Sequence, residues 1–304
     1  VNAEAVRVAI RRNSDGYYYT GSDDPANYWS SSEVWLVPSG TQTWSYTIPA
    51  GDSLWVYASS YTVRSKAKSL YGDRWQGDPG QLPITESIFW FDNVAPVSVV
   101  LSPPAGVPHY NAATLPTLSG TAADELSGIS KVEYQLRDLT YPSTFWNAAT
   151  QSWVEAIELW NLSNWSAPVW STYVPVSAFS DGHRYRVQSK AYDNTLPSPG
   201  IIEVPSAGNE FIFDISIPTA TVIKPPLDGV PSVFVVEGQN VPAYRSSFVI
   251  TGDMLDKLPG IVERVEVYVY DFIADQYYRE PGWGELLWIS TETTSKFSTW
   301  VSSW

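Results

Sequence analysis

Hydrophobic residues alternate with polar ones over short stretches of this chain, and a period of two predicts β-strands. Residues 6–10, 132–136 and 265–269 each place three apolar side chains on one face, and residues 61–67 alternate as a half-buried antiparallel strand does. Asp-Gly, Ser-Gly and proline clusters separate the stretches, without helical crossovers. This pattern predicts an all-β chain of β-sandwiches. Only residues 153–160 have a helical spacing, so at most one short helix is expected.

Two sequence blocks recur along the chain. Phe-x-Phe-Asp-x-x-x-Pro occurs at 89–96 and again at 211–218, and Tyr-x-Val-x-Ser-Lys-Ala occurs at 61–67 and again at 185–191. The period of about 120–130 residues is the size of one domain and exceeds that of a small solenoid repeat. The repeats therefore predict tandem domains.

The predicted domains are residues 1–94, 95–216 and 217–304. The middle copy is complete and opens with strands at 97–101 and 118–122. The first copy lacks these opening strands, and the last copy lacks its closing strands. Two interpretations follow: the favoured one is a window from a longer array, and the other is a subunit whose open ends are completed by neighbouring subunits.

These motifs resemble the immunoglobulin-like repeats of large bacterial cell-surface and secreted proteins. The resemblance rests on the two Phe-x-Phe-Asp-x-x-x-Pro blocks, on Ser119–Ile129 and on the two Tyr-x-Val-x-Ser-Lys-Ala blocks, and it covers nearly the whole chain. It implies tandem immunoglobulin-like β-sandwich domains in an extended array, located outside the cell or on its surface. It implies no particular ligand, because such domains are spacers, adhesin stalks or fibre subunits.

Composition narrows the possible functions. With 18 Lys and Arg against 32 Asp and Glu, the formal net charge is -14, so the chain is not expected to bind nucleic acid. The absence of Cys excludes disulfides and thiolate-bound metals, and no apolar run reaches the ~20 residues that span a bilayer, so no direct membrane insertion is expected. His109 and His183 accompany no Gly-x-Ser-x-Gly or His-Glu-x-x-His motif. A non-enzymatic protein is therefore expected.

Acidic residues at predicted turns and junctions raise calcium as a hypothesis, because this hard cation binds several carboxylate and carbonyl oxygens. The metal candidates are Asp92, Asn93, Asp124, Asp193 and Asp214. No Asp-x-Asp-x-Asp-Gly loop supports them, and an isolated Asp near a turn usually caps its own backbone. We therefore expect no cofactor, with calcium as the alternative.

The chain contains 15 Trp and 19 Tyr, which raises a second alternative. Flat aromatic faces stack on sugar rings, and exposed aromatic residues are also enriched in protein interfaces. The candidates for either role are Trp29, Trp35, Trp146, Trp153, Trp160, Trp283 and Trp288. Core packing is the favoured explanation, since every copy carries aromatic residues at corresponding places.

The sequence thus predicts a non-enzymatic extracellular structural protein, a segment of a repetitive immunoglobulin-like fibre, stalk or adhesin. Its expected partners are neighbouring domains or other copies of itself, with surface glycans or proteins as further options. The alternative function is a carbohydrate-binding β-sandwich module of a secreted glycan-active protein.

Overall fold

The regular secondary structure of the chain is nearly all β-strand in a computed structural model. The described residues are 3–69, 74–140, 144–224, 234–236, 239–241, 250–257, 260, 262–271, 274–279, 282–284, 289–290, 292–293 and 299–302. Within these ranges the helical elements are three short 3₁₀ turns, η1 (Pro25–Asn27), η2 (Gly51–Leu54) and η3 (Val176–Ala178). The expected all-β fold class is confirmed at this level.

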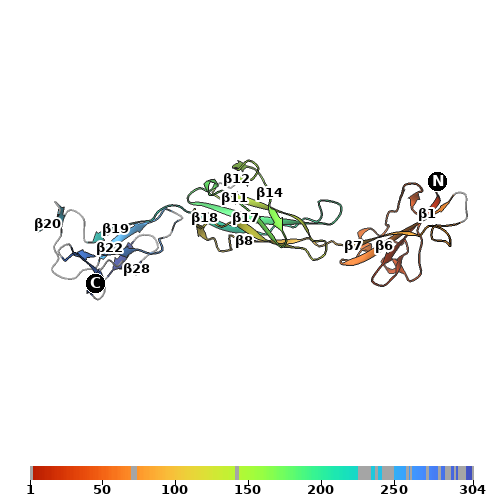
Figure 1. Cartoon of the computed structure of the whole chain (residues 1–304), viewed down its shortest axis with the longest axis horizontal. Helices are drawn as coiled ribbons and strands as arrows, with labels where there is room; N and C mark the ends of the chain where they lie inside the picture. Colours follow the sequence, from red (N-terminus) through yellow and green to blue (C-terminus); the bar gives the residue numbers. More distant parts are fainter. Residues whose placement is uncertain are drawn as a thin grey trace. The chain divides into compact units, whose positions relative to one another are not determined.

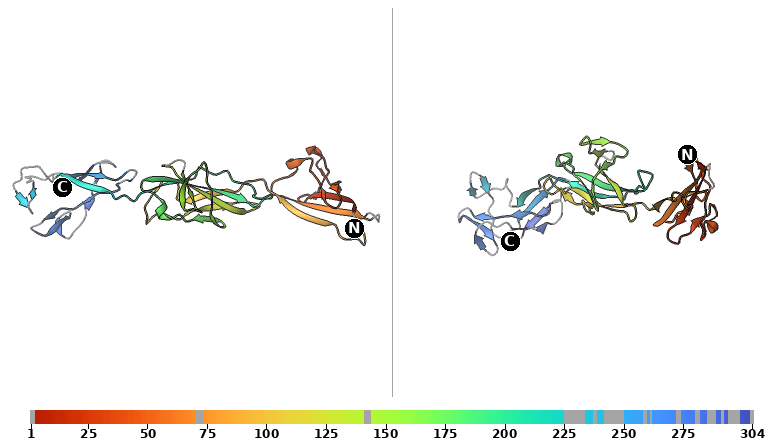
Figure 2. Two further views of the ribbon diagram at one scale, coloured as in Figure 1. Left: turned by 90° about the horizontal axis from the view of Figure 1, so that it is seen from above. Right: turned by 45° about the vertical axis from the view of Figure 1, so that its right-hand side comes forward.

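The N-terminal part forms a five-stranded antiparallel sheet in the order β3-β2-β1-β6-β7 (Figure 1). The strands are β1 (Ala3–Arg12), β2 (Tyr18–Tyr19), β3 (Trp29–Ser30), β6 (Ser59–Ser69) and β7 (Thr85–Phe91), and β4 (Ser39–Gly40) pairs separately with β5 (Trp44–Ser45). Figure 2 shows the long strands β1, β6 and β7 from two further sides. Val6, Val8 and Ile10 are buried on one face, as their spacing predicts.

The middle part contains two sheets. The first has the order β15-β16-β10-β8, with β8 (Val97–Ser102), β10 (Leu118–Ala123), β15 (Asn164–Ser166) and β16 (Val169–Thr172). The second has the order β13-β12-β11-β17-β18-β9, with β14 paired to β11, and comprises β9 (His109–Tyr110), β11 (Ile129–Asp138), β12 (Thr144–Asn147), β13 (Ser152–Glu155), β14 (Asn161–Leu162), β17 (His183–Asp193) and β18 (Asn209–Phe213). A buried hydrogen bond of 2.8 Å from Ser98 Oγ on β8 to Ser189 Oγ on β17 joins the two sheets.

The C-terminal part consists of shorter strands. They are β19 (Thr219–Lys224), β20 (Phe234–Val236), β21 (Gln239–Val241), β22 (Ile250–Leu255), β23 (Glu266–Val267), β24 (Tyr270–Asp271), β25 (Gln276–Arg279), β26 (Gly282–Gly284), β27 (Ile289–Ser290), β28 (Glu292–Thr293) and β29 (Thr299–Ser302). Its sheets are β19-β22-β29-β28, β24-β25-β26 and the pairs β20-β21 and β23-β27. Ile250, Met254, Val262, Val265 and Val267 form a buried apolar cluster here.

The helix allowed for residues 153–160 does not form. Residues Ser152–Glu155 are strand β13, and Trp153 pairs with Trp146 across the β12–β13 hairpin. The two rings make an edge-to-face contact with centroids 5.8 Å apart. This cross-strand aromatic contact, together with the pairing of β12 to β11, favours the strand over an isolated short helix.

Two recurrent blocks occupy equivalent places in their strands. Tyr61 on β6 pairs with Phe89 on β7, and Tyr185 on β17 pairs with Phe211 on β18. In both pairs the rings stack, with centroids 5.5 Å apart for Tyr61 and Phe89 and 5.4 Å apart for Tyr185 and Phe211. The sequence repeat is therefore also a repeat of local structure.

The equivalence extends to the turn before each tyrosine. The N–H of Val56 donates to Tyr61 Oη at 3.0 Å, and the N–H of Ser180 donates to Tyr185 Oη at 2.8 Å, five residues apart in both cases. A 3₁₀ turn precedes each bond, η2 in the first case and η3 in the second. Each tyrosine thus fixes the same upstream turn.

Contacts divide the chain into two compact units. The first consists of Val1–Val97, Ala123–Ser130 and Ala191–Glu203, and the second of Ser98–Ala122, Lys131–Lys190 and Val204–Trp304. The boundaries expected after residues 94 and 216 stay predictions. The first unit contains three segments that are distant in sequence: the end of β7, the loop after β10 and the end of β17 with the loop that follows it.

Candidate metal centre

Three acidic side chains of the first unit converge. One carboxylate oxygen each of Asp92, Asp124 and Asp193 lies within 4.8 Å of the other two. Asp92 directly follows β7, Asp124 directly follows β10, and Asp193 is the last residue of β17. The site is thus built where three strands end, from residues far apart in the sequence.

Asp124 is held by the turn that follows it. Its Oδ1 accepts hydrogen bonds from the N–H groups of Leu126 at 3.0 Å, Ser127 at 2.8 Å and Gly128 at 2.8 Å. Gly128 has φ +73°, a left-handed conformation that glycine adopts without steric cost. The Ser-Gly pair of the sequence motif therefore lets the backbone wrap around this carboxylate.

Asp193 is held in the same manner but more deeply. Asp193 is only 1% exposed. Its Oδ1 accepts hydrogen bonds from the N–H of Thr195 at 3.0 Å, from Thr195 Oγ1 at 2.6 Å and from the N–H of Ile201 at 2.8 Å. Its Oδ2 is buried and has no hydrogen-bond partner. One oxygen thus shapes the loop while the other is left unpaired, which is costly for a buried polar atom.

The two carboxylate oxygens of Asp92 also differ, as those of Asp193 do. Its Oδ1 accepts from Val94 N–H at 3.1 Å, and its Oδ2 is buried without a hydrogen-bond partner. Asp92 and Asp193 therefore each bring an unsatisfied carboxylate oxygen to the same unit.

The two loops are also tied to each other. The Nδ2 of Asn194 donates to Ser127 O at 3.0 Å, and the N–H of Asn194 donates to Gly128 O at 3.1 Å. These bonds join the loop after Asp193 to the turn after Asp124 independently of any ion. The carboxylates consequently sit on a framework that is already formed.

The charge of this cluster is not balanced by nearby protein cations. Among the described residues, Asp92, Asp124 and Asp193 form no ion pair with Lys, Arg or His. Burial raises the pKa of Tyr57, and the negative charges of Glu125, Asp92 and Asp124 raise it further. Three acidic groups without a counter-charge create a region of strongly negative electrostatic potential, which favours binding of a cation.

Three of the five metal candidates named from the sequence are brought together, and two are not. Asn93 is exposed. Asp214 lies in the second unit, where Ser216 Oγ is 2.5 Å from Asp214 Oδ1 and 3.1 Å from Asp256 Oδ1. Within the described residues no third acidic group joins these two.

Sequence reasoning missed the relation between Asp124 and Asp256. Residues 120–129 read Gly-Thr-Ala-Ala-Asp-Glu-Leu-Ser-Gly-Ile, and residues 252–261 read Gly-Asp-Met-Leu-Asp-Lys-Leu-Pro-Gly-Ile. The signal was the shared Gly, Asp, Leu, Gly and Ile spacing. In the second copy Lys257 replaces the acidic residue that follows the Asp, and its Nζ forms an ion pair with Asp181 at 2.8 Å.

Two of the aromatic candidates are part of the interior. Trp146 is 2% exposed, and Trp153 is half-buried with its Nε1 donating to Ala178 O at 2.7 Å. Trp153 also contacts Tyr185, with ring centroids 5.4 Å apart. Packing and hydrogen bonding account for both indoles.

Three further candidates carry a cation over the ring face. Arg12 lies over Trp29 at 4.4 Å, Lys66 over Trp35 at 3.9 Å and Lys190 over Trp160 at 4.3 Å. Each cation–π contact occupies one of the two faces of the indole and makes that face unavailable for stacking on a sugar ring. Trp283 lies in β26, and Trp288 lies outside the described residues.

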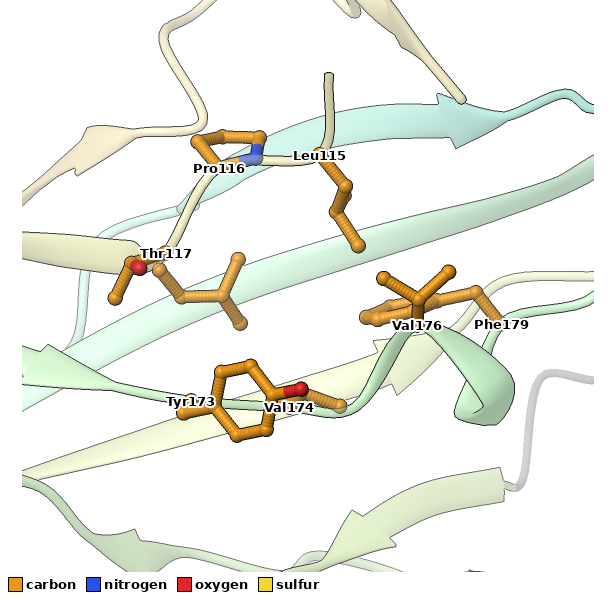
Figure 3. A pocket seen from close by; sticks show the side chains of 8 residues that line it. Leu115, Pro116, Thr117, Tyr173, Val174, Val176 and Phe179 are labelled. Atoms are coloured by element: carbon orange, nitrogen blue, oxygen red, sulfur yellow. The ribbon is translucent and has the colours of Figure 1, made fainter. Parts of the chain in front are cut away.

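A small apolar pocket lies in the second unit. Figure 3 shows the side chains of Leu115, Val174, Val176 and Phe179 around it. Its volume is about 50 Å³, room for a water molecule or two and too little for a sugar ring. The pocket therefore does not add to the carbohydrate alternative.

A larger hollow lies beside the acidic cluster in the first unit. Asp92, Ser127 and Asn194 line it together with the exposed Trp90. It provides an approach from solvent to Asp92, and a metal site requires such an entry path.

None of the helices in the described ranges is long and apolar enough to cross a membrane. No protein-family model, curated protein or solved structure matches the chain.

Proposed function

We propose that the chain is a non-enzymatic structural protein of the cell exterior, built of tandem immunoglobulin-like β-sandwich domains as part of a fibre, stalk or adhesin. The observation that carries this proposal is the repeated tyrosine arrangement. Tyr61 and Tyr185 each stack on a phenylalanine of the next strand and accept a hydrogen bond from the residue five positions upstream. Repetition of one packing unit at the spacing of a whole domain supports an array of domains, each of which buries its own core.

The packing around these tyrosines supports the same proposal. Trp55 contacts Tyr61 and Phe89 with centroids 4.8 and 5.2 Å away, and Phe179 contacts Tyr185 and Phe211 with centroids 5.0 and 5.7 Å away. Each copy thus closes an aromatic core with its own residues, without disulfides. The net charge of -14 opposes association of neighbouring rods.

Single-molecule force spectroscopy of the full chain tests the array. Tandem domains unfold one at a time, so up to three unfolding events are expected, with contour lengths that follow the predicted domain lengths of 94, 122 and 88 residues. A single event that extends the whole chain would contradict the proposal. Surface labelling of cells that produce the protein tests its location, and protein confined to the cell interior would contradict that part.

The carbohydrate-binding alternative is tested separately. A glycan array is expected to show no binding by the full chain, because Trp146 is buried, the Nε1 of Trp153 is hydrogen-bonded inside the fold, and a cation lies over one face of each of Trp29, Trp35 and Trp160. Saccharide binding that Trp35→Ala abolishes would favour the carbohydrate-binding module instead.

A further inference from the structure

We propose that Asp92, Asp124 and Asp193 bind a calcium ion. This inference goes beyond the proposed function and does not rest on it, because the geometry lies within one compact unit. Three carboxylates lie within 4.8 Å of one another, and Asp193 is almost fully buried, with a relative exposure of 1%. Like charges at this separation repel one another unless a cation or protons intervene.

The unpartnered oxygens identify where the ion binds. Oδ1 of each aspartate accepts backbone hydrogen bonds from its own loop, whereas Oδ2 of Asp92 and Oδ2 of Asp193 are buried without a partner. Buried polar atoms are nearly always satisfied, so two orphaned oxygens beside a third carboxylate require an explanation. A bound cation satisfies both oxygens and neutralises most of the charge.

The donor set selects the kind of cation. The clustered ligands are carboxylates, with no His or Cys among the described groups, and such hard oxygens favour Ca²⁺ or Mg²⁺ over zinc. Ca²⁺ accepts six to eight oxygen ligands at about 2.3–2.6 Å in a flexible geometry, whereas Mg²⁺ requires near-ideal octahedral geometry at about 2.0–2.1 Å and loses its water reluctantly. The irregular arrangement of three strand ends suits Ca²⁺.

The ion joins segments that are distant in sequence. It links the end of β7 to the loop after β10 and to the loop that begins at Asp193. Ca²⁺ requires six to eight oxygen ligands, and water entering through the hollow that Asp92 lines supplies those that the carboxylates do not. Binding therefore stabilises the first unit, because the ion binds the folded arrangement and not the unfolded chain.

The experiment uses the full chain after removal of metal with a chelator. Calorimetric titration with CaCl₂ is expected to show one saturable site, and the midpoint of thermal unfolding is expected to rise with Ca²⁺. Terbium is a second probe, because Trp90 lines the hollow with Asp92 and can transfer excitation energy to a lanthanide bound there. MgCl₂ at the same concentration is expected to have a much smaller effect.

Matched variants locate the site. Asp193→Asn keeps the side-chain shape and is expected to weaken Ca²⁺ binding by at least about tenfold, since the ligand charge count sets affinity. Asp256→Asn alters the sequence-equivalent turn of the second unit, where two acidic residues meet without a third, and is expected to leave Ca²⁺ binding unchanged. Asp92→Asn provides a second site variant if Asp193→Asn fails to fold.

The outcomes are separable. Absence of Ca²⁺ binding by the intact chain, or loss of binding in Asp256→Asn alone, overturns the site. An equal response to Mg²⁺ overturns the assignment to calcium. Neither result affects the sequential unfolding expected under force, so failure of the site and failure of the array are distinguishable.

Discussion

Gly200 leaves no room for a side chain beside Asp193. A Cβ at Gly200 would lie 2.4 Å from Asp193 Oδ1 and 2.4 Å from Asp193 O, and the φ of Gly200 is +84°. Real Cβ atoms do not approach a carboxylate so closely, so the glycine is what allows the loop to close over the acid. The loop from Asp193 to Ile201 therefore places Oδ1 for its backbone hydrogen bonds.

We predict that Gly200→Ala destabilises the first unit by about 2–4 kcal/mol, because left-handed backbone strain adds to a clash with Asp193. Gly51→Ala is the matched control: its φ is +56°, but nothing lies within 4 Å of its Cβ position. It should cost only the backbone strain, about 1–2 kcal/mol. Calorimetric unfolding in chelator compares the two variants. Equal losses would show that the contact with Asp193 is unimportant.

A second prediction concerns the hydrogen bond between Ser180 and Tyr185. Tyr185→Phe removes the acceptor of the Ser180 N–H, leaves that donor unsatisfied and is expected to cost about 1–3 kcal/mol. Tyr61→Phe should cost a similar amount, because Val56 donates to Tyr61 in the equivalent way. Tyr173→Phe, at a residue 74% exposed, should change the free energy of unfolding by less than about 0.5 kcal/mol. A loss in Tyr185→Phe no larger than that in Tyr173→Phe would show that the hydrogen bond does not stabilise the fold, and clearly unequal losses in Tyr185→Phe and Tyr61→Phe would refute the equivalence of the two turns.

The same tyrosine makes stability depend on alkaline pH. Burial raises the pKa of Tyr185 to about 12 from an ordinary value of 10, and the charge of Asp138 contributes in the same direction. The unfolded chain therefore loses this proton at lower pH than the folded chain does. The stabilisation that the neutral Tyr185 side chain contributes to the free energy of unfolding is therefore fully present below about pH 10. It is lost as the pH rises through about 12. Unfolding midpoints between pH 9 and 12 should fall less steeply in Tyr185→Phe than in the parent chain; identical slopes would contradict the prediction.

Much of the fold could be predicted from side-chain periodicity. The strands expected at 97–101, 118–122 and 132–136 lie within β8, β10 and β11. Val132, Tyr134 and Leu136 are fully buried, as their shared face requires. The period of two is reliable here because one face of each strand is packed and the pattern is local. The helical spacing of residues 153–160 gave the wrong prediction, because the pairing of Trp153 with Trp146 on the neighbouring strand cannot be seen in local spacing.

The candidate site could be predicted only in pieces. Asp92, Asp124 and Asp193 were each recognisable as acids at turns, and capping of their own backbone was indeed one role of every one of them. Their convergence depends on which strand ends meet, which is a property of the tertiary contacts. The same local signal at Asp214 leads to a pair with Asp256 instead. Local turn chemistry therefore identifies candidates, and topology selects among them.

A final prediction concerns the close approach of two strands at Gly120. A Cβ there would lie 1.8 Å from Val99 O and 2.6 Å from Trp170 Nε1, and Trp170 is fully buried with its Nε1 donating to Val99 O at 3.2 Å. The indole thus packs over the glycine and bonds the neighbouring strand, an arrangement that requires the missing side chain. Gly120→Ala must displace both the β8 backbone and the indole, so we expect a loss of about 3 kcal/mol or more, above the usual cost of overpacking.

The neighbouring Thr121 supplies the control for Gly120. Its side chain points to the opposite face of β10 and is half-buried, so Thr121→Ala should cost about 1 kcal/mol or less. Calorimetric unfolding of both variants, with Trp fluorescence to follow the indole, measures the difference. If Gly120→Ala changes neither the midpoint of thermal unfolding nor the Trp fluorescence emission, then β8, β10 and Trp170 are packed less closely than these distances indicate. A large loss confined to Gly120→Ala would instead establish that this glycine is selected by the contact between β8 and β10 and not by a turn.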